Sequence, residues 1–144
     1  MNRKIKRIPV LIFLLLATSI EAANIYKEET MTKAPEQIIE QQLKAYNAGD
    51  IDSFMESFHP EIKVYNYPDE LIFDTKEAKR EAYEKMFKKF PNNHAEIVER
   101  MTFGNFVIDK EKVTGRGEAP PMYVIAMYEV KDELIYRVTF LREK

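Results

Sequence analysis

The sequence predicts an α+β domain in which three N-terminal helices pack in a curved, mostly antiparallel sheet. Apolar residues recur at helical spacing through the first half of the folded region, with a break at Gly49 and Asp50. After Pro91 the spacing changes to the two-residue alternation that is typical of strands. Helices that precede strands in this way are expected to lie together on one face of an antiparallel sheet.

The first two helices are expected to join without a loop. The first is predicted over residues 35–47, because Pro35 suits the first position of a helix. Gly49 can take the positive φ at which helices end. The carboxylate of Asp50 can then cap a second, short helix, which His59 and Pro60 stop.

The third helix is expected from Asp74 to Phe90. Asp74 can cap this helix while the side chain of Glu77 reaches back to the cap. The apolar stripe of the helix predicts one buried face, with Lys79 on the side toward water. Pro91 ends the helix.

Strand character follows the second helix once and the third helix four times. Gly104 and Asn105 form a two-residue turn, and residues 131–133 form a second tight connection, so the strands that they join should pair antiparallel. The longer link at residues 115–122 contains two glycines and two prolines and is expected to be a mobile lip. The strands are expected at residues 62–67, 94–103, 106–114, 123–130 and 134–141.

The first 22 residues have the pattern of a secretory signal peptide. Four basic residues within the first seven precede an apolar run at residues 8–20, and Ala22 offers a cleavage site. As a helix this run covers about 20 Å, short of the roughly 30 Å hydrocarbon core, so we expect no stable membrane span. The predicted organisation is a signal peptide at 1–22, a flexible tether at 23–34 and one domain at 35–144, exported to the periplasm or secreted. The alternative is a cytosolic form that starts at Met31.

Composition argues against several classes of protein. Loss of the predicted signal peptide removes four basic residues and Glu21 and leaves a net charge of about −5, with basic residues interspersed among acids. We therefore expect no nucleic-acid partner. The chain has no cysteine and only two histidines, so we expect no disulfide, no metal site and no nucleophilic cysteine. No glycine-rich phosphate loop is present, and no cofactor is expected.

Five segments, taken together with their order and spacing, resemble a known family. They read AYNAGDIDSFMESF, IKVYNYP, EAKREAYEKMF, PNNHAEIVERMTFGNFVIDKEKV and AMYEVKDELIYRVTF. The chain resembles the nuclear transport factor 2-like superfamily, specifically its SnoaL-like, steroid delta-isomerase-like branch, from Pro35 to the C-terminus. The resemblance implies a cone-shaped, cystatin-like α+β fold with a largely apolar cavity, commonly a homodimer through the sheet. It does not imply one reaction, because the fold hosts isomerases, cyclases, dehydratases, transport proteins and non-enzymes.

The resemblance also implies where a steroid isomerase would carry its catalytic groups. Ketosteroid isomerases of this fold use a carboxylate late in the first strand, a tyrosine on the first helix and a protonated carboxylic acid on the sheet. The corresponding positions hold Asn66, Gln42 and Ala126. An amide does not titrate near neutral pH and cannot move a proton as a carboxylate does. We therefore expect no ketosteroid-isomerase-type catalysis.

Two candidates for acid–base chemistry lie near the ends of strands. Asp69 can reach the cavity if its loop folds inward, and the alternative is a solvated turn aspartate. His94 begins a strand on which Glu96 and Arg100 alternate with it on one face. That row can form a polar wall, and the alternative is a sheet face in water whose charges pair across strands.

Asp109 and Glu111 are a third candidate, because they share a face of one strand. Paired carboxylates can divide acid and base work only if they are buried together. An isomerase, lyase or cyclase that uses His94, Asp69 or this pair is therefore an open alternative.

The favoured function is binding of a small hydrophobic molecule, because aromatic residues are plentiful enough to line a concave fold. A further alternative is a dimeric interaction module whose cavity its own side chains fill. Apolar residues on both faces of the last strands favour a homodimer. The expected ligand-binding residues are Tyr46, Phe54, Phe58, Tyr65, Asn66, Tyr67, Met86, Phe90, Tyr123, Ile125 and Met127.

Overall fold

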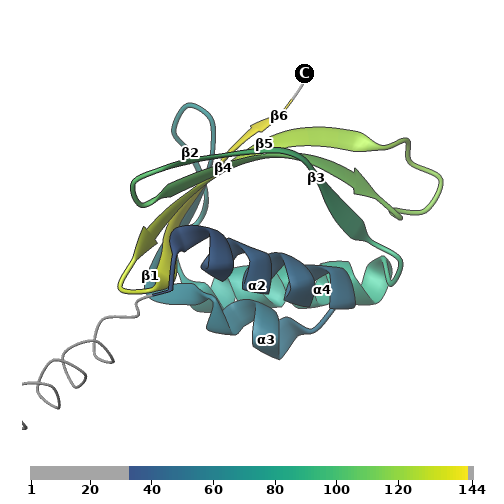
Figure 1. Ribbon diagram of the computed structural model, residues 1–144. Coiled ribbons are helices and arrows are strands. Elements are labelled where there is room, and N and C mark those ends of the chain that lie inside the picture. Colours follow the sequence, from purple (N-terminus) through teal and green to yellow (C-terminus); the bar gives the residue numbers. More distant parts are fainter. Residues whose placement is uncertain (1–32, 143–144) are drawn as a thin grey trace, which may run out of the picture. The chain divides into compact units, whose positions relative to one another are not determined.

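A six-stranded mixed sheet curves over a layer of helices in the computed structural model, which describes residues 33–142 (Figure 1). The strand order is β2-β1-β6-β5-β4-β3, and every neighbouring pair is antiparallel except β1 and β6, which are parallel. The strands are β1 (Phe58–Asn66), β2 (Glu70–Phe73), β3 (His94–Phe103), β4 (Phe106–Thr114), β5 (Met122–Lys131) and β6 (Leu134–Arg142).

The helices are α2 (Pro35–Ala48), α3 (Ile51–Glu56) and α4 (Lys76–Lys89). The predicted break between the first two is confirmed: Gly49 ends α2 with φ 65°, and the side chain of Asp50 accepts a hydrogen bond from the Ser53 N–H. The cap of α4 is Thr75 rather than Asp74, since the Thr75 hydroxyl accepts from the Ala78 N–H. The predicted signal peptide and nearly all of the predicted tether lie outside the described residues.

The prediction of three N-terminal helices is met only in part, because β1 and β2 precede α4 in the chain. The edge strand β2 was not expected, since it is only four residues long and follows a turn that contains Pro68. Strand β1 begins at Phe58, earlier than predicted, and its pairing with β6 is interrupted between Phe58 and Lys63. Pro60 lies within this interruption, where it has no N–H to donate to a ladder.

The core lies between the helices and the inner face of the sheet. Aromatic side chains of α2, α3, β1, β2 and α4 pack in edge-to-face, tilted or stacked pairs, with ring centroids 4.8 to 6.3 Å apart. Full burial of such a side chain contributes about 1.5–3 kcal/mol. The side chain of Asn47 then joins α2 to β3, because it both accepts from the Ala95 N–H and donates to the Ala95 carbonyl.

Strand alternation decides which residues face the core. In β4 the buried residues are Val107, Asp109, Glu111 and Val113, and in β5 they include Val124, Ala126 and Tyr128. None of the helices within residues 33–142 is long and apolar enough to cross a membrane.

Candidate functional site

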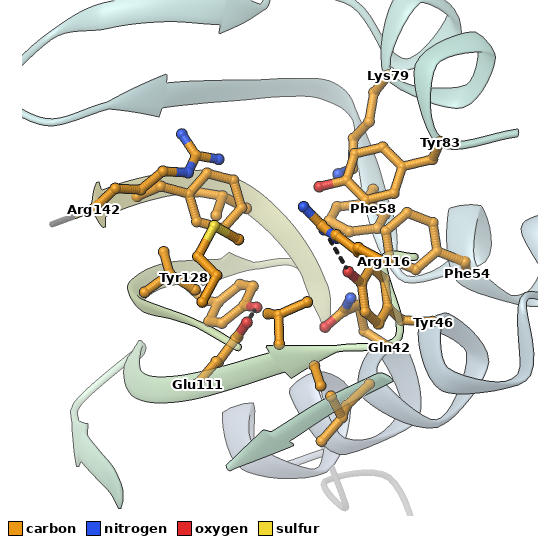
Figure 2. Close-up of a pocket in the computed structure, with 17 residues that line it drawn as sticks. Gln42, Tyr46, Phe54, Phe58, Lys79, Tyr83, Glu111, Arg116, Tyr128 and Arg142 are labelled. Atoms are coloured by element: carbon orange, nitrogen blue, oxygen red, sulfur yellow. Dashed lines mark hydrogen bonds between the residues drawn. The ribbon is translucent and has the colours of Figure 1, made fainter. Parts of the chain in front are cut away.

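A pocket with a cavity volume of about 70 Å³ lies between the helices and the inner face of the sheet (Figure 2). Residues from every described helix and strand except β2 line the pocket. One residue of the loop before β5 also lines it. The acidic and basic side chains of Lys79, Glu111, Arg116 and Arg142 are part of the wall, so the lining is more polar than the sequence predicts. The other lining residues are Gln42, Leu43, Tyr46, Phe54, Phe58, Tyr83, Ala95, Val113, Met122, Val124, Tyr128, Val138 and Phe140.

Glu111 is the carboxylate of this pocket. It points inward from β4, is 7% exposed, and its Oε1 accepts a hydrogen bond of 2.8 Å from the Tyr128 hydroxyl. Burial raises the pKa of Glu111 to about 7, and the Tyr128 hydrogen bond opposes that rise. Burial also raises the pKa of Tyr128 well above 10, so the phenol remains a proton donor. The carboxyl group can thus accept or release a proton near neutral pH.

Lys79 is the second ionisable group that burial strongly affects. It lies on α4, is 1% exposed, and its Nζ lies over the rings of Tyr83, Phe58 and Phe54 at 3.8, 4.2 and 4.9 Å from their centroids. Desolvation lowers the pKa of Lys79 to about 7. Within residues 33–142 no carboxylate forms a salt bridge with it.

Arg116 covers the pocket from the loop between β4 and β5. Its Nη2 donates to the Tyr46 hydroxyl at 3.1 Å and its Nε donates to Oδ1 of Asn93 at 2.9 Å. Figure 2 shows Glu111 and Tyr128 together on one side of the pocket and Arg116 with Tyr46 on the other. An acid–base group therefore faces a fixed positive charge across the cavity.

Gln42 adds a free acceptor to the wall. Its side chain is buried, and its Oε1 has no hydrogen-bond partner among the described residues. A buried acceptor without a partner costs free energy, and a donor group on a bound molecule can remove that cost.

The sequence matches the SnoaL-like domain model over residues 39–138. The chain belongs to the SnoaL-like domain family. No curated protein matches it. Among solved structures, it is similar to an uncharacterised cystatin-fold protein from Novosphingobium aromaticivorans, with 28% identity, coverage of 76% of this chain and 98% of the other, and a TM-score of 0.69.

Two more distant structures share the fold of this SnoaL-like domain. One is a putative polyketide cyclase from Sinorhizobium meliloti, with 22% identity, 72% and 93% coverage of this chain and that chain, and a TM-score of 0.63. The other is an epoxide hydrolase of the LEH-like type from M. tuberculosis, with 14% identity, 76% and 82% coverage, and a TM-score of 0.66.

The positions that ketosteroid isomerases use are occupied differently in this SnoaL-like domain. Gln42 lines the pocket. Asn66 is outside the lining and bonds instead to Glu70 and Arg142. Ala126 is fully buried on the inner face and offers no functional group. The carboxylate of this pocket is therefore on β4, not on β1.

The predicted pair Asp109 and Glu111 is buried on one face, but its two members have different surroundings. Asp109 is fully buried and forms a bidentate ion pair with Arg100, with Nε–Oδ1 at 2.7 Å and Nη2–Oδ2 at 2.8 Å. Arg100 also reaches Glu40 on α2 at 3.2 Å. Asp109 thus ties β4 to β3 and α2, and it is not part of the pocket lining.

The other two acid–base candidates lie outside the pocket lining. Asp69 is exposed in the turn between β1 and β2, and His94 is exposed at the start of β3. The predicted row of His94, Glu96 and Arg100 does not exist, because the β3–β4 register shifts between Ile97 and Glu99. The shift turns Arg100 to the inner face, opposite Asp109.

Some of the predicted ligand-binding residues line the pocket and others do not. Three of them, Tyr46, Phe54 and Phe58, line the pocket. The β5 prediction chose the wrong face, because alternation places Val124, Ala126 and Tyr128 inside. The remaining predicted residues, Tyr65, Asn66, Tyr67, Met86, Phe90, Tyr123, Ile125 and Met127, are outside the lining.

The prediction that Lys79 lies on the side toward water is wrong, because its side chain is 1% exposed and lines the pocket. Sequence reasoning also missed Tyr83, Arg116 and Tyr128 as pocket residues. One signal was present in α4, since Lys79 stands four residues before Tyr83 and eight before Phe87, on the buried stripe of the helix. Arg116 could not have been found by periodicity, because it belongs to a loop.

Proposed function

We propose that this SnoaL-like domain binds a small carbonyl compound in its pocket and moves a proton on it, with Glu111 as the acid–base group. The observation that carries the proposal is the inward-facing Glu111 carboxyl, held by Tyr128 and brought by burial to a pKa of about 7. A general base works best when its pKa lies near the working pH.

The proton transfer requires a group that takes up negative charge. Ionised Glu111 removes a proton from the carbon next to the carbonyl, and the charge develops on the carbonyl oxygen. Arg116 faces Glu111 across the pocket, and Arg142 also lines it. Cations fixed where charge develops stabilise such a transition state. The protonated Glu111 then returns the proton to another atom, which makes the step an isomerisation or prepares a cyclisation or elimination.

Cavity size supports movement of Arg116 during ligand entry. About 70 Å³ holds only a few waters, whereas pockets for larger organic ligands measure roughly 300–1,000 Å³. Among residues 33–142 the Arg116 side chain hydrogen-bonds only to Tyr46 and Asn93, and its loop contains Gly115 and Gly117 with positive φ. An outward movement of the guanidinium during entry would enlarge the pocket toward solvent, and its return over the bound molecule would place the positive charge opposite Glu111.

The test is hydrogen–deuterium exchange at the α-carbon of a panel of small ketones and aldehydes in D₂O, followed by NMR. Glu111→Gln should slow enzyme-dependent exchange by about 100-fold or more, because one general base contributes on the order of 10²–10⁴. Asp69→Asn is the matched control, since this carboxylate is exposed outside the pocket. Equal exchange rates in the wild type and Glu111→Gln would reject the proposal.

Binding without chemistry is the second candidate. The aromatic wall of Tyr46, Phe54 and Phe58 and the unpartnered Gln42 Oε1 support it. Native mass spectrometry of protein purified from its own compartment would then reveal a retained small molecule, while the exchange assay would show no turnover.

Export and dimerisation are part of the same proposal. Export rests on the signal-peptide pattern of residues 1–22. The dimer rests on an outer patch of exposed apolar residues on the sheet face away from the helices, where Met101 pairs with Ile108 and Ile108 with Met127. Exposed apolar clusters of this kind are typical of protein interfaces. The outer patch consists of Met101, Phe103, Tyr123, Met127 and Leu141.

A further inference from the structure

The amine of Lys79 is placed unusually for a lysine. Lysine side chains almost never bury fully without a charged partner. Lys79 is 1% exposed, and its Nζ lies among the ring faces of Phe54, Phe58 and Tyr83 instead of beside a carboxylate. Exposed lysines of the same helix, such as Lys85 with Glu81, form ordinary ion pairs with neighbouring carboxylates.

This environment favours the uncharged amine. Removal from water destabilises an ammonium ion, and aromatic faces compensate only in part. Burial lowers the pKa of Lys79 to about 7, so close to half of the amine carries a lone pair at neutral pH. The other titratable and charged groups that line the same pocket are Tyr46, Tyr83, Glu111, Arg116, Tyr128 and Arg142.

We infer that Lys79 is a nucleophile that forms an imine with a small ketone or aldehyde in the pocket. Desolvated lysines in hydrophobic surroundings are the kind that attack carbonyl carbons. The side chain of Lys79 and the three rings around its Nζ are part of the pocket wall, so a carbonyl compound held there lies beside these groups.

The step balances without any further reactant. The Nζ lone pair forms a bond to the carbonyl carbon, and the C=O π electrons move to oxygen. The nitrogen loses a proton and the oxygen gains one, which gives a carbinolamine. A second proton, for which Glu111 elsewhere in the lining of the same pocket is a donor, lets the oxygen leave as water and gives a protonated imine.

The inference rests on the proposed function and deepens it. A protonated imine withdraws electrons from the neighbouring carbon more strongly than a ketone does. Glu111 would then take the proton from an activated substrate, and the electrons would move into the imine nitrogen as an enamine. The substrate class is therefore a small compound with a ketone or aldehyde group.

The test is reductive trapping of the full chain with acetone and sodium cyanoborohydride at pH 7, followed by peptide mapping. Reduction turns an imine at lysine into a stable isopropylamine. We expect Lys79 to be labelled at least about 10-fold faster than Lys85, which lies on the same helix but is largely exposed. The expected excess follows from the pKa difference, because an ordinary lysine with a pKa of about 10.4 holds very little free amine at pH 7.

The pH profile gives a second readout. Labelling of Lys79 should reach half its maximum near pH 7. Lys79→Arg keeps the charge and Lys79→Met keeps the volume, and either variant should lose the fast label while Lys85 is labelled as before. Labelling of Lys79 no faster than that of Lys85 overturns the inference.

The two proposals fail in different ways. If Lys79 is trapped but Glu111→Gln exchanges α-protons like the wild type, the result supports the imine and rejects the acid–base role of Glu111. If Glu111→Gln loses exchange but Lys79 is not trapped, the result supports Glu111 as the base and rejects the imine.

Discussion

Asp109 and Glu111 lie on the same inner face of β4, yet only Asp109 is paired with an arginine. Arg100 forms a bidentate ion pair with Asp109, whereas Glu111 receives one hydrogen bond from Tyr128. Burial raises the pKa of Glu111, and the negative charge of Asp109 raises it further. The paired carboxylate therefore supports the fold, and the one without an arginine partner is available for chemistry.

The first prediction concerns stability between pH 4.5 and 7. The folded protein holds Glu111 protonated up to about pH 7, whereas the unfolded chain ionises it near 4.5. The unfolded state binds fewer protons in this window, so the Glu111 contribution to the free energy of unfolding falls as pH rises. Glu111→Gln should remove this fall and be about 3 kcal/mol more stable above pH 7. Urea denaturation at a series of pH values measures it, with Asp69→Asn expected to keep the wild-type slope.

The second prediction concerns Lys79, whose effect on the free energy of unfolding changes with pH in the opposite direction to that of Glu111. Its pKa falls from 10.5 to about 7 in the folded state, so between these values the unfolded chain binds more protons than the folded one. The Lys79 contribution to the free energy of unfolding should rise with pH from about 7 to 10.5. Lys79→Met should abolish that rise and stabilise the protein at pH 7 by on the order of 4 kcal/mol. If the free energy of unfolding of Lys79→Met rose with pH as in the wild type, the rise could not come from a desolvated amine at Lys79.

The third prediction tests the buried ion pair. Arg100→Met leaves the fully buried Asp109 without its partner and should lower the free energy of unfolding by about 3 kcal/mol or more. The matched control is Lys85→Met, which breaks the exposed pair with Glu81 and should cost no more than about 0.5 kcal/mol. Similar losses in the two variants would show that Arg100 is not the partner of a desolvated charge.

The fourth prediction compares two glycines of the loop that carries Arg116. A Cβ at Gly115 would lie 1.7 Å from the Asn92 carbonyl oxygen, so the backbone must shift, whereas a Cβ at Gly117 would meet nothing within 4 Å. Both residues have positive φ, and an alanine costs about 1–2 kcal/mol at either for that reason. Gly115→Ala should therefore lose clearly more stability than Gly117→Ala. It should also break the contact of Arg116 with Tyr46, seen as changed tyrosine NMR signals.

The fifth prediction tests the outer patch. Met127→Glu places a charge on an apolar face that a second copy of the chain would cover, so it should convert a dimer into monomers in light scattering. Gln41→Glu adds the same charge to an exposed position on α2 and should leave the mass unchanged. A wild type that scatters as a monomer at micromolar concentration would remove the proposal.

Much of the fold follows from local signals in the sequence. Pro35, Gly49 and Asp50 mark helix ends through backbone chemistry that involves only neighbouring residues, and the structure confirms all three. The four late strands were also predicted to within one or two residues. Alternation, however, states only that two sets of residues face opposite ways. In β5 both sets are apolar from Met122 to Tyr128, and only the charged Glu129 and Lys131 at the end of the strand indicate that the set of Met127 faces outward.

The sequence by itself determined the order of helices and strands, the turns between late strands, and the family to which the chain belongs. The tertiary structure alone decided the chemistry of the pocket. Whether Glu111 or Lys79 is charged depends on which groups from distant elements surround it, since burial shifts a pKa only when the chain is folded. The tertiary structure also decided two placements of arginine side chains. The β3 bulge brings Arg100 opposite Asp109, and the loop before β5 places Arg116 beside Tyr46.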